Sequence, residues 1–209
     1  MKYSRWPCLA ALVVALLLIT SCARKRDYIP VNKDSLKASG KLYLAPLGEF
    51  PLEPIQDLAA FYRKKYNVDV EVLSSVPLSP AARNPERGQL IAEQAIEILK
   101  QARPELKDNP RAVLIGITEE DMYISKYDWQ FSFSYRDEGK YAVVSSGRMH
   151  LPSGRQEVTE ELIFTRLRKM VTKNVGILYY RLSQSDDPRS VLYRNVGGIR
   201  ELDYMGEEF

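Results

Sequence analysis

Histidine and cysteine are scarce in this sequence of 209 residues. It has one histidine, His150, and two cysteines, Cys8 and Cys22. A single chain of this composition cannot form a zinc site from three histidines or from four cysteines. Because Cys8 lies in a segment that we expect to be removed, the mature chain has one cysteine and cannot form an internal disulfide bond.

A strong excess of one charge is also missing. The chain has 30 Lys and Arg residues against 27 Asp and Glu residues, which gives a formal net charge of +3. Two of the cations, Lys2 and Arg5, lie in the segment that we expect to be removed, which leaves 28 basic residues against 27 acidic ones. Proteins that bind DNA or RNA through the phosphates usually have a clear basic excess. We therefore expect no nucleic-acid partner.

Residues 1–21 have the features of a signal peptide. Two positive charges in "MKYSRWP" precede an apolar run, "LAALVVALLLI", that is too short to span a membrane comfortably. The run leads into "ITSC", which resembles the lipobox of bacterial lipoproteins. The resemblance implies that Cys22 becomes the first residue and carries lipid. An uncleaved anchor and a plain secretory signal are the alternatives.

Acylation of Cys22 would hold the protein on a membrane of the bacterial cell envelope without a spanning helix. In lipoprotein sorting, an aspartate after the cysteine tends to retain a protein at the inner membrane. Ala23 stands there instead, which favours the outer membrane. Residues 22–40 are polar and aperiodic, so we predict a flexible tether there and a folded domain over residues 41–209.

Hydrophobic periodicity in the domain alternates between strand and helix patterns. We predict strands at residues 41–47, 68–73 and 112–117, a hairpin from Trp129 to Tyr135 that returns at 141–146, and helices near 55–62, over 84–100 and after Thr159. Thr159 is a good N-cap for the last helix, whose apolar stripe reaches Leu178. This order of elements predicts an α/β domain, a mixed sheet with helices packed on it.

The same series of segments resembles the archaemetzincins, which are compact zinc metallopeptidases of the metzincin type. The resemblance is carried by "KLYLAPLGEF", "NPERGQLIAEQAIEIL", "AVLIGITEEDMY", "FSFSYRDEGKYAVVSSGRM" and the closing residues from "SVLY" to "MGEEF". It runs from about Lys41 to Phe209. It implies a metzincin-like fold, with a twisted mixed sheet, two supporting helices and an active-site helix near the C-terminus.

Archaemetzincin chemistry depends on an HExxHxxGxxH motif, in which three histidines bind zinc and the glutamate is the general base. Laid on "TKNVGILYYRL", residues 172–182, the three ligand positions hold Thr172, Gly176 and Leu182. Lys173 takes the position of the base. Glycine has no side chain to bind a metal, and a lysine would repel a zinc ion. We therefore predict no zinc, no other cofactor and no zinc-dependent catalysis.

Other positions of the family pattern have changed as well. Tyr179 stands at the turn glycine, and Ser183 replaces the cysteine that follows the third ligand. In "SVLY", Ser190 stands for a cysteine and Leu192 for the methionine of the Met-turn. The vestigial site positions are Thr172, Lys173, Gly176 and Leu182, and the helix that carries this lost site is expected to have a structural role.

Three other groups of residues are weaker candidates for a site. His150, in "RMHLPSG", is expected in an exposed loop rather than in a catalytic centre. Glu119, Glu120 and Asp121 could bind a hard cation, but a helix N-cap or a solvated turn explains them more simply. The serines of "VVSSG" have no evident His-Asp partners.

Two features are expected to retain a function. The segment "KYAVVSS" resembles the edge strand along which metzincins bind an extended peptide, so Tyr141, Val143 and Ser145 are the predicted peptide-binding residues. Gly176 is predicted to allow close packing of that segment, or of Trp129, into the space of the lost metal.

These observations predict a non-catalytic archaemetzincin-like lipoprotein that binds a peptide or an envelope protein, or that acts in assembly at the envelope. The alternative is an envelope peptidase or hydrolase with a metal-independent or non-standard site.

Overall fold

The computed structural model describes residues 28–38, 40–155 and 157–209. The predicted signal peptide and Cys22 lie outside these ranges, so lipid attachment stays a prediction. Within the described ranges, no helix has the length and apolar character needed to cross a membrane.

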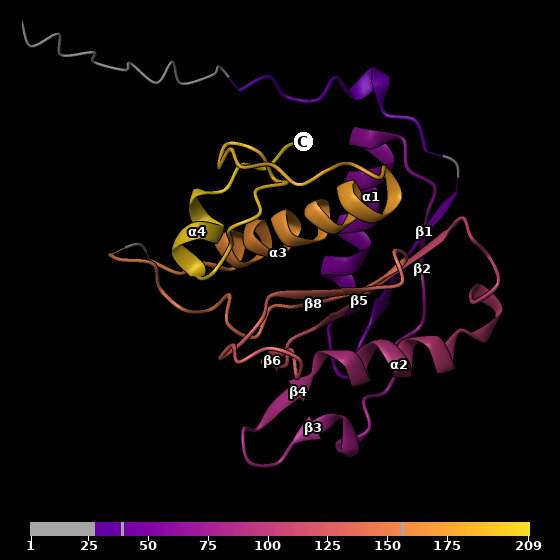
Figure 1. The fold of residues 1–209 in the computed structure, drawn as a ribbon, viewed down its shortest axis with the longest axis vertical. Helices are drawn as coiled ribbons and strands as arrows, with labels where there is room; N and C mark the ends of the chain where they lie inside the picture. Colours follow the sequence, from indigo (N-terminus) through magenta and orange to yellow (C-terminus); the bar gives the residue numbers. More distant parts are fainter. Residues whose placement is uncertain (1–27, 39, 156) are drawn as a thin grey trace, which may run out of the picture.

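A five-stranded sheet forms the centre of the domain, in the order β2-β1-β5-β8-β7 (Figure 1). Its strands are β1 (Lys41–Pro46), β2 (Val70–Val72), β5 (Ala112–Thr118), β7 (Ser134–Asp137) and β8 (Tyr141–Ser145). The pairs β2-β1, β1-β5 and β5-β8 are parallel, and β7 is antiparallel to β8. The sheet is therefore mixed, as predicted, and every residue of the central strand β5 is buried.

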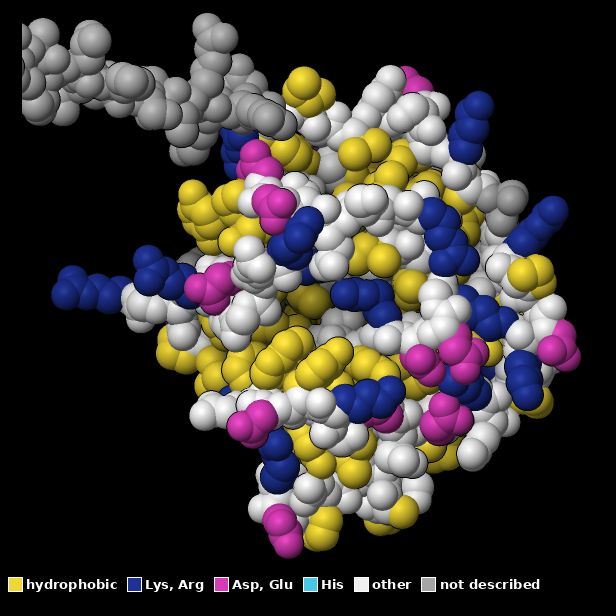
Figure 2. Space-filling view, viewed as in Figure 1, with side chains coloured by type: hydrophobic (Ala, Val, Ile, Leu, Met, Phe, Trp, Pro, Cys, Tyr) yellow, Lys and Arg dark blue, Asp and Glu magenta, His cyan; other side chains and the backbone are white. Residues whose placement is uncertain are grey.

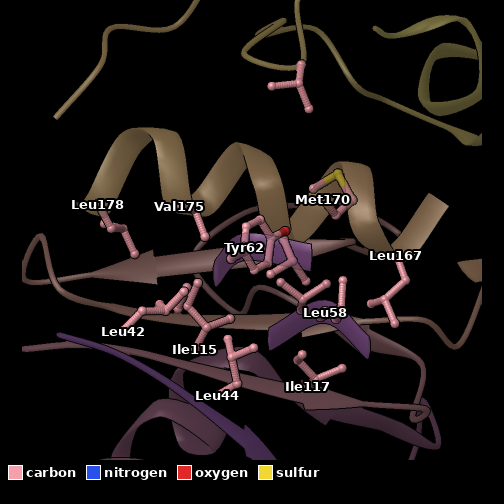
Figure 3. Packing of buried hydrophobic residues seen from close by; sticks show 14 of the residues in the cluster. Leu42, Leu44, Leu58, Tyr62, Ile115, Ile117, Leu167, Met170, Val175 and Leu178 are labelled. Carbon is pink, nitrogen blue, oxygen red and sulfur yellow. The ribbon is translucent and has the colours of Figure 1, made fainter. Parts of the chain in front are cut away.

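Helices cover both faces of this sheet (Figure 1). The long helices α1 (Leu52–Tyr66) and α3 (Glu160–Asn174) pack on one face, and α2 (Ala92–Ala102) packs on the other. Each face has its own apolar core. Figure 3 shows the larger core, where side chains of α3 and α1 meet those of β1 and β5. The predicted α/β layers are confirmed.

Helix α3 begins where the sequence predicts. The Thr159 side chain accepts a hydrogen bond from the Leu162 backbone N–H, and two glutamates occupy the first turn. A π-helical turn, η4 (Val175–Tyr179), extends α3 to the end of its apolar stripe. Short 3-10 helices lie at η1 (Lys33–Ser35), η2 (Pro80–Ala82) and η3 (Pro104–Leu106), and a last short helix is α4 (Ile199–Tyr204).

The prediction of a helix over residues 84–100 is wrong in its first part. Residues before Ala92 form a small second sheet, β3-β4-β6, from β3 (Arg83–Asn84), β4 (Gln89–Ile91) and β6 (Met122–Tyr123). Gly88 has a φ of 64°, which turns the chain between β3 and β4 and cannot continue a right-handed helix. The predicted hairpin strand is also shorter than expected, because only Ser134–Asp137 pairs with β8.

The prediction that "KYAVVSS" is an edge strand is wrong. Strand β8 lies between β5 and β7, and each of its five residues is buried. Tyr141 and Val143 contribute to the core under α2, and the Ser145 hydroxyl donates to the backbone oxygen of Glu120. These three residues are therefore not placed to contact a peptide. The edge of the sheet on this side is β7.

Part of the predicted tether lies against the domain. The Val31 backbone N–H donates to the Phe209 oxygen over 3.0 Å, and the Tyr28 hydroxyl donates to the Glu208 oxygen. Leu36 packs against the larger core. Contacts with the fold thus begin before Lys41, where the domain was predicted to start.

Candidate functional site

The first of the three vestigial ligand positions is occupied by a hydrogen bond between helices. Thr172 is fully buried, and its hydroxyl lies 2.9 Å from the hydroxyl of Tyr62 on α1. Burial raises the pKa of the Tyr62 phenol, so this group stays neutral in the physiological range. Both hydroxyls are thus used in a neutral contact that ties α3 to α1.

The second position, Gly176, is closed by other side chains. A Cβ atom at this residue would meet a carbon of Leu192 and a carbon of Phe209, each at 2.7 Å. Phe209 is buried, and its ring centroid lies 5.0 Å from that of Tyr66. The prediction that β8 or Trp129 fills this space is wrong, because Leu192 and Phe209 fill it. Leu192 is the residue placed at the Met-turn by resemblance.

The third position, Leu182, follows a sharp turn in the chain. Its backbone N–H donates to the Gly176 oxygen over 2.9 Å, so the second and third positions remain neighbours. The turn uses a left-handed conformation at Arg181, whose φ is 58°. Tyr179, at the position of the family's turn glycine, instead belongs to the π-helical turn. The leucine side chain packs against the core and offers no ligand atom.

These three positions do not fit a zinc ion. One hydroxyl is already bonded to Tyr62, one residue has no side chain, and one side chain is a hydrocarbon. Over residues 28–38, 40–155 and 157–209, no group of three or more His, Cys, Asp or Glu residues is arranged to hold a metal. The chemistry of a metzincin cannot be derived from this geometry.

The residue at the position of the general base faces a different environment. Lys173 is 3% exposed, and its ammonium group donates to the backbone oxygen of Tyr193. Burial, helped by the nearby Arg136, lowers the pKa of Lys173 to about 8. The Arg136 guanidinium donates to the Asn174 side-chain oxygen over 3.0 Å, and Asn174 also bonds to Ser134. The last turn of α3 is thus joined to the edge strand β7 by polar groups.

A cavity of about 890 Å³ opens next to this polar group. One wall is the segment 128–132, which precedes β7, and the other is the segment 194–197 with Glu201. Lys173 bonds to the residue just before the second wall, and Ser132 of the first wall bonds to Ser134. Figure 2 shows a hollow in the middle of the face, with hydrophobic side chains inside it and Lys or Arg side chains beside it.

A network that the sequence analysis missed holds the first wall of the cavity. Arg87 donates to the backbone oxygens of Trp129 and Gln130, and Gln89 donates to the Gln130 oxygen and to Asp121. Arg87 and Gln89 are the arginine and glutamine of "NPERGQ", so this part of the resemblance corresponds to a loop-holding contact. Both residues are visible in the sequence, but the predicted helix over residues 84–100 gave no reason to expect that they hold a loop.

The weaker candidates are used in structural contacts. Glu120 pairs with Arg83, and Asp121 accepts hydrogen bonds of 2.8–3.0 Å from Arg148. His150 is exposed in a turn, as predicted. The Ser146 hydroxyl donates to a backbone oxygen on β5. These contacts give no nucleophile with an adjacent base and no cation site.

Comparison of the sequence with known proteins finds archaemetzincins. The chain is 28% identical to an archaemetzincin of Haloquadratum walsbyi over 167 residues, which cover 78% of this chain and 91% of the relative. An archaemetzincin of Natronomonas pharaonis matches with the same identity and coverage. No protein-family model matches the chain.

Solved structures of similar fold agree. The archaemetzincin of Archaeoglobus fulgidus, in complex with malonate, has a TM-score of 0.62 at 23% identity, covering 81% of this chain and 94% of that one. The archaemetzincin of Methanopyrus kandleri has a TM-score of 0.63 at 22% identity, covering 87% and 92%. A zinc-dependent peptidase of Methanocorpusculum labreanum has a TM-score of 0.66 at 18% identity, covering 80% and 95%.

Proposed function

Since this chain is archaemetzincin-like in sequence and fold, we propose that it is a non-catalytic, lipid-anchored member of that group, which binds extended peptides at the bacterial cell envelope. The observation that carries the proposal is the contrast between the former zinc site and a nearby cavity. The former ligand positions are closed, Thr172 by its hydrogen bond to Tyr62 and Gly176 by apolar packing, while a cavity lies open next to segment 128–132.

The loss of catalysis follows from what replaces the zinc site. Leu192 and Phe209 occupy the space beside Gly176, and the group at the position of the base is a buried cation. A cation there can neither activate a water molecule as a base nor share the space with a zinc ion.

Peptide binding is supported by the edge strand β7. The Phe133 oxygen accepts from the Ser145 N–H on β8, so the backbone groups of Ser134 and Arg136 face away from β8. The N–H and oxygen of Ser134 already bond to the Ser132 hydroxyl, so strand addition would begin at Arg136. Among the described residues, no strand pairs with that outer side. An extended peptide could add there as a sixth strand, and its neighbouring side chains would enter the cavity next to segment 128–132.

Aromatic side chains at the cavity favour a peptide ligand further. Trp129 is 55% exposed, lines the cavity and stacks on Tyr127 with a centroid distance of 4.5 Å. Exposed aromatic rings of this kind are common in protein-binding surfaces.

The anchor is the part of the proposal that rests on sequence alone. The apolar run followed by "ITSC" supports acylation of Cys22, and Ala23 supports the outer membrane. Replacing Cys22 by serine should release the protein from membranes or misdirect it. Unchanged membrane fractionation of that variant would contradict acylation.

Metal analysis and a cleavage assay separate the binding protein from a hydrolase. The purified full-length protein should contain no stoichiometric zinc and should not cleave casein or a mixture of unstructured peptides. Stoichiometric zinc with chelator-sensitive cleavage would overturn the proposal, and cleavage without metal would favour a metal-independent hydrolase.

A peptide selection tests binding directly. The full-length protein in detergent is used to select from a random peptide library, and selected peptides are N-methylated at one residue at a time. Strand addition predicts that methylation weakens binding at every second residue, because alternate N–H groups face the sheet. Absence of any selected peptide would contradict the proposed function.

A further inference from the structure

Within the described residues, two cations near the end of α3, Lys173 on the helix and Arg136 on β7, have no anionic partner. Lys173 is 3% exposed, and Arg136 is partly exposed. Their hydrogen bonds go to neutral oxygens, those of Tyr193 and Asn174. Across the described part of the chain, neither has a carboxylate within the 4.0 Å of an ion pair.

This arrangement is unfavourable for the free protein. A buried ammonium group loses the solvation that water would provide, and a second cation nearby adds repulsion. An ammonium group has three donors, and one of them bonds to Tyr193. An anion in contact with both side chains would replace the favourable interactions with water that the cations lose on burial.

The Arg136 side chain lies on the side of β7 that faces α3, the helix that carries Lys173. Ser134 and Arg136 both contact Asn174 of that helix, whereas Asp137 contacts Lys100 of α2. Tyr135 likewise packs with the core under α2. A peptide added to the β7 edge would therefore direct alternate side chains, or its end, toward Arg136 and Lys173.

We propose that Arg136 and Lys173 bind a carboxylate of the peptide that lies along β7. The inference rests on the proposed peptide-binding function and specifies its ligand: an acidic peptide, or a peptide whose C-terminal carboxylate ends at this site. A guanidinium and an ammonium group together match the two oxygens of a carboxylate. The low pKa of Lys173, which burial causes, agrees with a cation that lacks its anion.

The first test compares forms of one selected peptide. The peptide is measured against the full-length protein with a free C-terminus, with an amidated C-terminus, and with its Asp and Glu residues replaced by Asn and Gln. The form that removes the bound carboxylate should bind about 10- to 100-fold more weakly, because hydrogen bonds to charged groups are strong. Loss on amidation identifies a C-terminal carboxylate, and loss on replacement identifies a side-chain carboxylate.

Variants of the protein test the two cations. Arg136→Gln and Lys173→Met should each weaken the binding of the intact peptide by about tenfold or more, and should leave the amidated or neutralised form unaffected. Lys64→Met and Arg155→Gln, which change exposed cations elsewhere, are the matched controls. Urea unfolding of each variant shows whether it is folded.

A second readout does not need a peptide. The pKa of Lys173 can be followed by the ¹³Cε shift of labelled lysines, assigned with Lys173→Met, in the presence and absence of malonate. Malonate bound at the site should raise that pKa, since a nearby anion favours the ammonium form. Chloride at equal ionic strength is the control.

The outcomes separate the two proposals. Selected peptides that bind equally well in all three forms and to both variants would overturn the carboxylate site and leave the peptide-binding function intact. If no peptide is selected, the peptide-binding function fails. A Lys173 pKa unchanged by malonate would then overturn the site too, and a raised one would support a carboxylate site without strand addition.

Discussion

Arg166 and Lys173 lie on the same helix, two turns apart, and both are buried, but their surroundings differ. The Arg166 guanidinium donates to both carboxylate oxygens of Asp203, over 2.6 and 2.7 Å, and to the backbone oxygens of Met149 and Leu151. The Lys173 ammonium group donates to the backbone oxygen of Tyr193, and a second cation, Arg136, lies nearby.

The difference distinguishes a buried cation that the fold itself neutralises from one that it leaves without an anion. The ion pair of Arg166 joins α3 to α4 and to the turn that contains Met149, so its charge is neutralised by the fold itself. At Lys173 the fold supplies no negative charge among the described residues. A buried charge without an anion is costly, and we propose that the ligand supplies the anion here.

The largest effect is expected at the neutralised cation. Arg166→Met leaves Asp203 mostly buried without its cation, and should lower the free energy of unfolding by about 3–5 kcal/mol. Urea unfolding measures it. Arg168→Met on the same helix, which breaks an exposed pair with Glu207, is the control and should cost less than about 1 kcal/mol. Equal losses of unfolding free energy in the two variants would mean that the buried ion pair contributes no more to stability than the exposed one.

The next effect tests the closed ligand position. Gly176→Leu should destabilise the protein by about 1–3 kcal/mol, because its side chain would collide with Leu192 and Phe209. Gly197→Leu is the matched control, since a Cβ there meets nothing within 4 Å. Unchanged stability of the Gly176 variant, by urea unfolding, would show that the metal space is still open.

A smaller effect is expected at the bond between Thr172 and Tyr62. Thr172→Val and Tyr62→Phe should each cost about 1 kcal/mol, because each leaves one buried hydroxyl without this partner. The double variant should be less destabilised than the sum of the two single variants. Strict additivity in this double-mutant cycle would mean that the two hydroxyls do not interact.

The smallest effect has the opposite sign. Since the pKa of Lys173 is lowered in the folded state, the unfolded chain binds more protons between about pH 8 and 10, and this residue makes stability rise with pH in that range. Well below pH 8, the full free-energy cost of burying the charged Lys173 is present. Lys173→Met should therefore stabilise the protein at pH 7, by up to about 1 kcal/mol once the unpaired Tyr193 oxygen is counted.

Urea unfolding of wild type and variant at pH 7 and at pH 9.5 checks this prediction. The stability difference between the two proteins should shrink at the higher pH. A variant that is less stable at pH 7 would mean that the ammonium group is already neutralised in the free protein.

The elements of the fold were predictable where the signals are local. The N-cap at Thr159 and the buried strand at Ala112–Ile117 come from neighbouring residues, and both agree with the structure. The helix start at residue 84 was wrong because Gly88 reverses the chain in a left-handed conformation that the apolar pattern does not show.

Features of the site that depend on distant residues could not be predicted. Strand β8 lies inside the sheet because β7 pairs with it. The hydrophobic pattern of a single strand does not reveal which strands will pair with it. Gly176 is closed by residues 16 and 33 positions away in the chain, Leu192 and Phe209. By contrast, the absence of a three-histidine zinc site needed only a count of histidines.

The contacts of Tyr28 and Val31 with the C-terminal residues would limit how far a lipid-anchored form of the protein could reach from the membrane. Only residues 23–27 separate Cys22 from Tyr28, which contacts Glu208, and six fully extended residues span at most about 20 Å. With lipid on Cys22, the domain would therefore stand within about its own diameter of the bilayer. Such a short linker would restrict the protein to ligands that come close to the membrane surface. It would also raise the effective concentration of those ligands at the cavity.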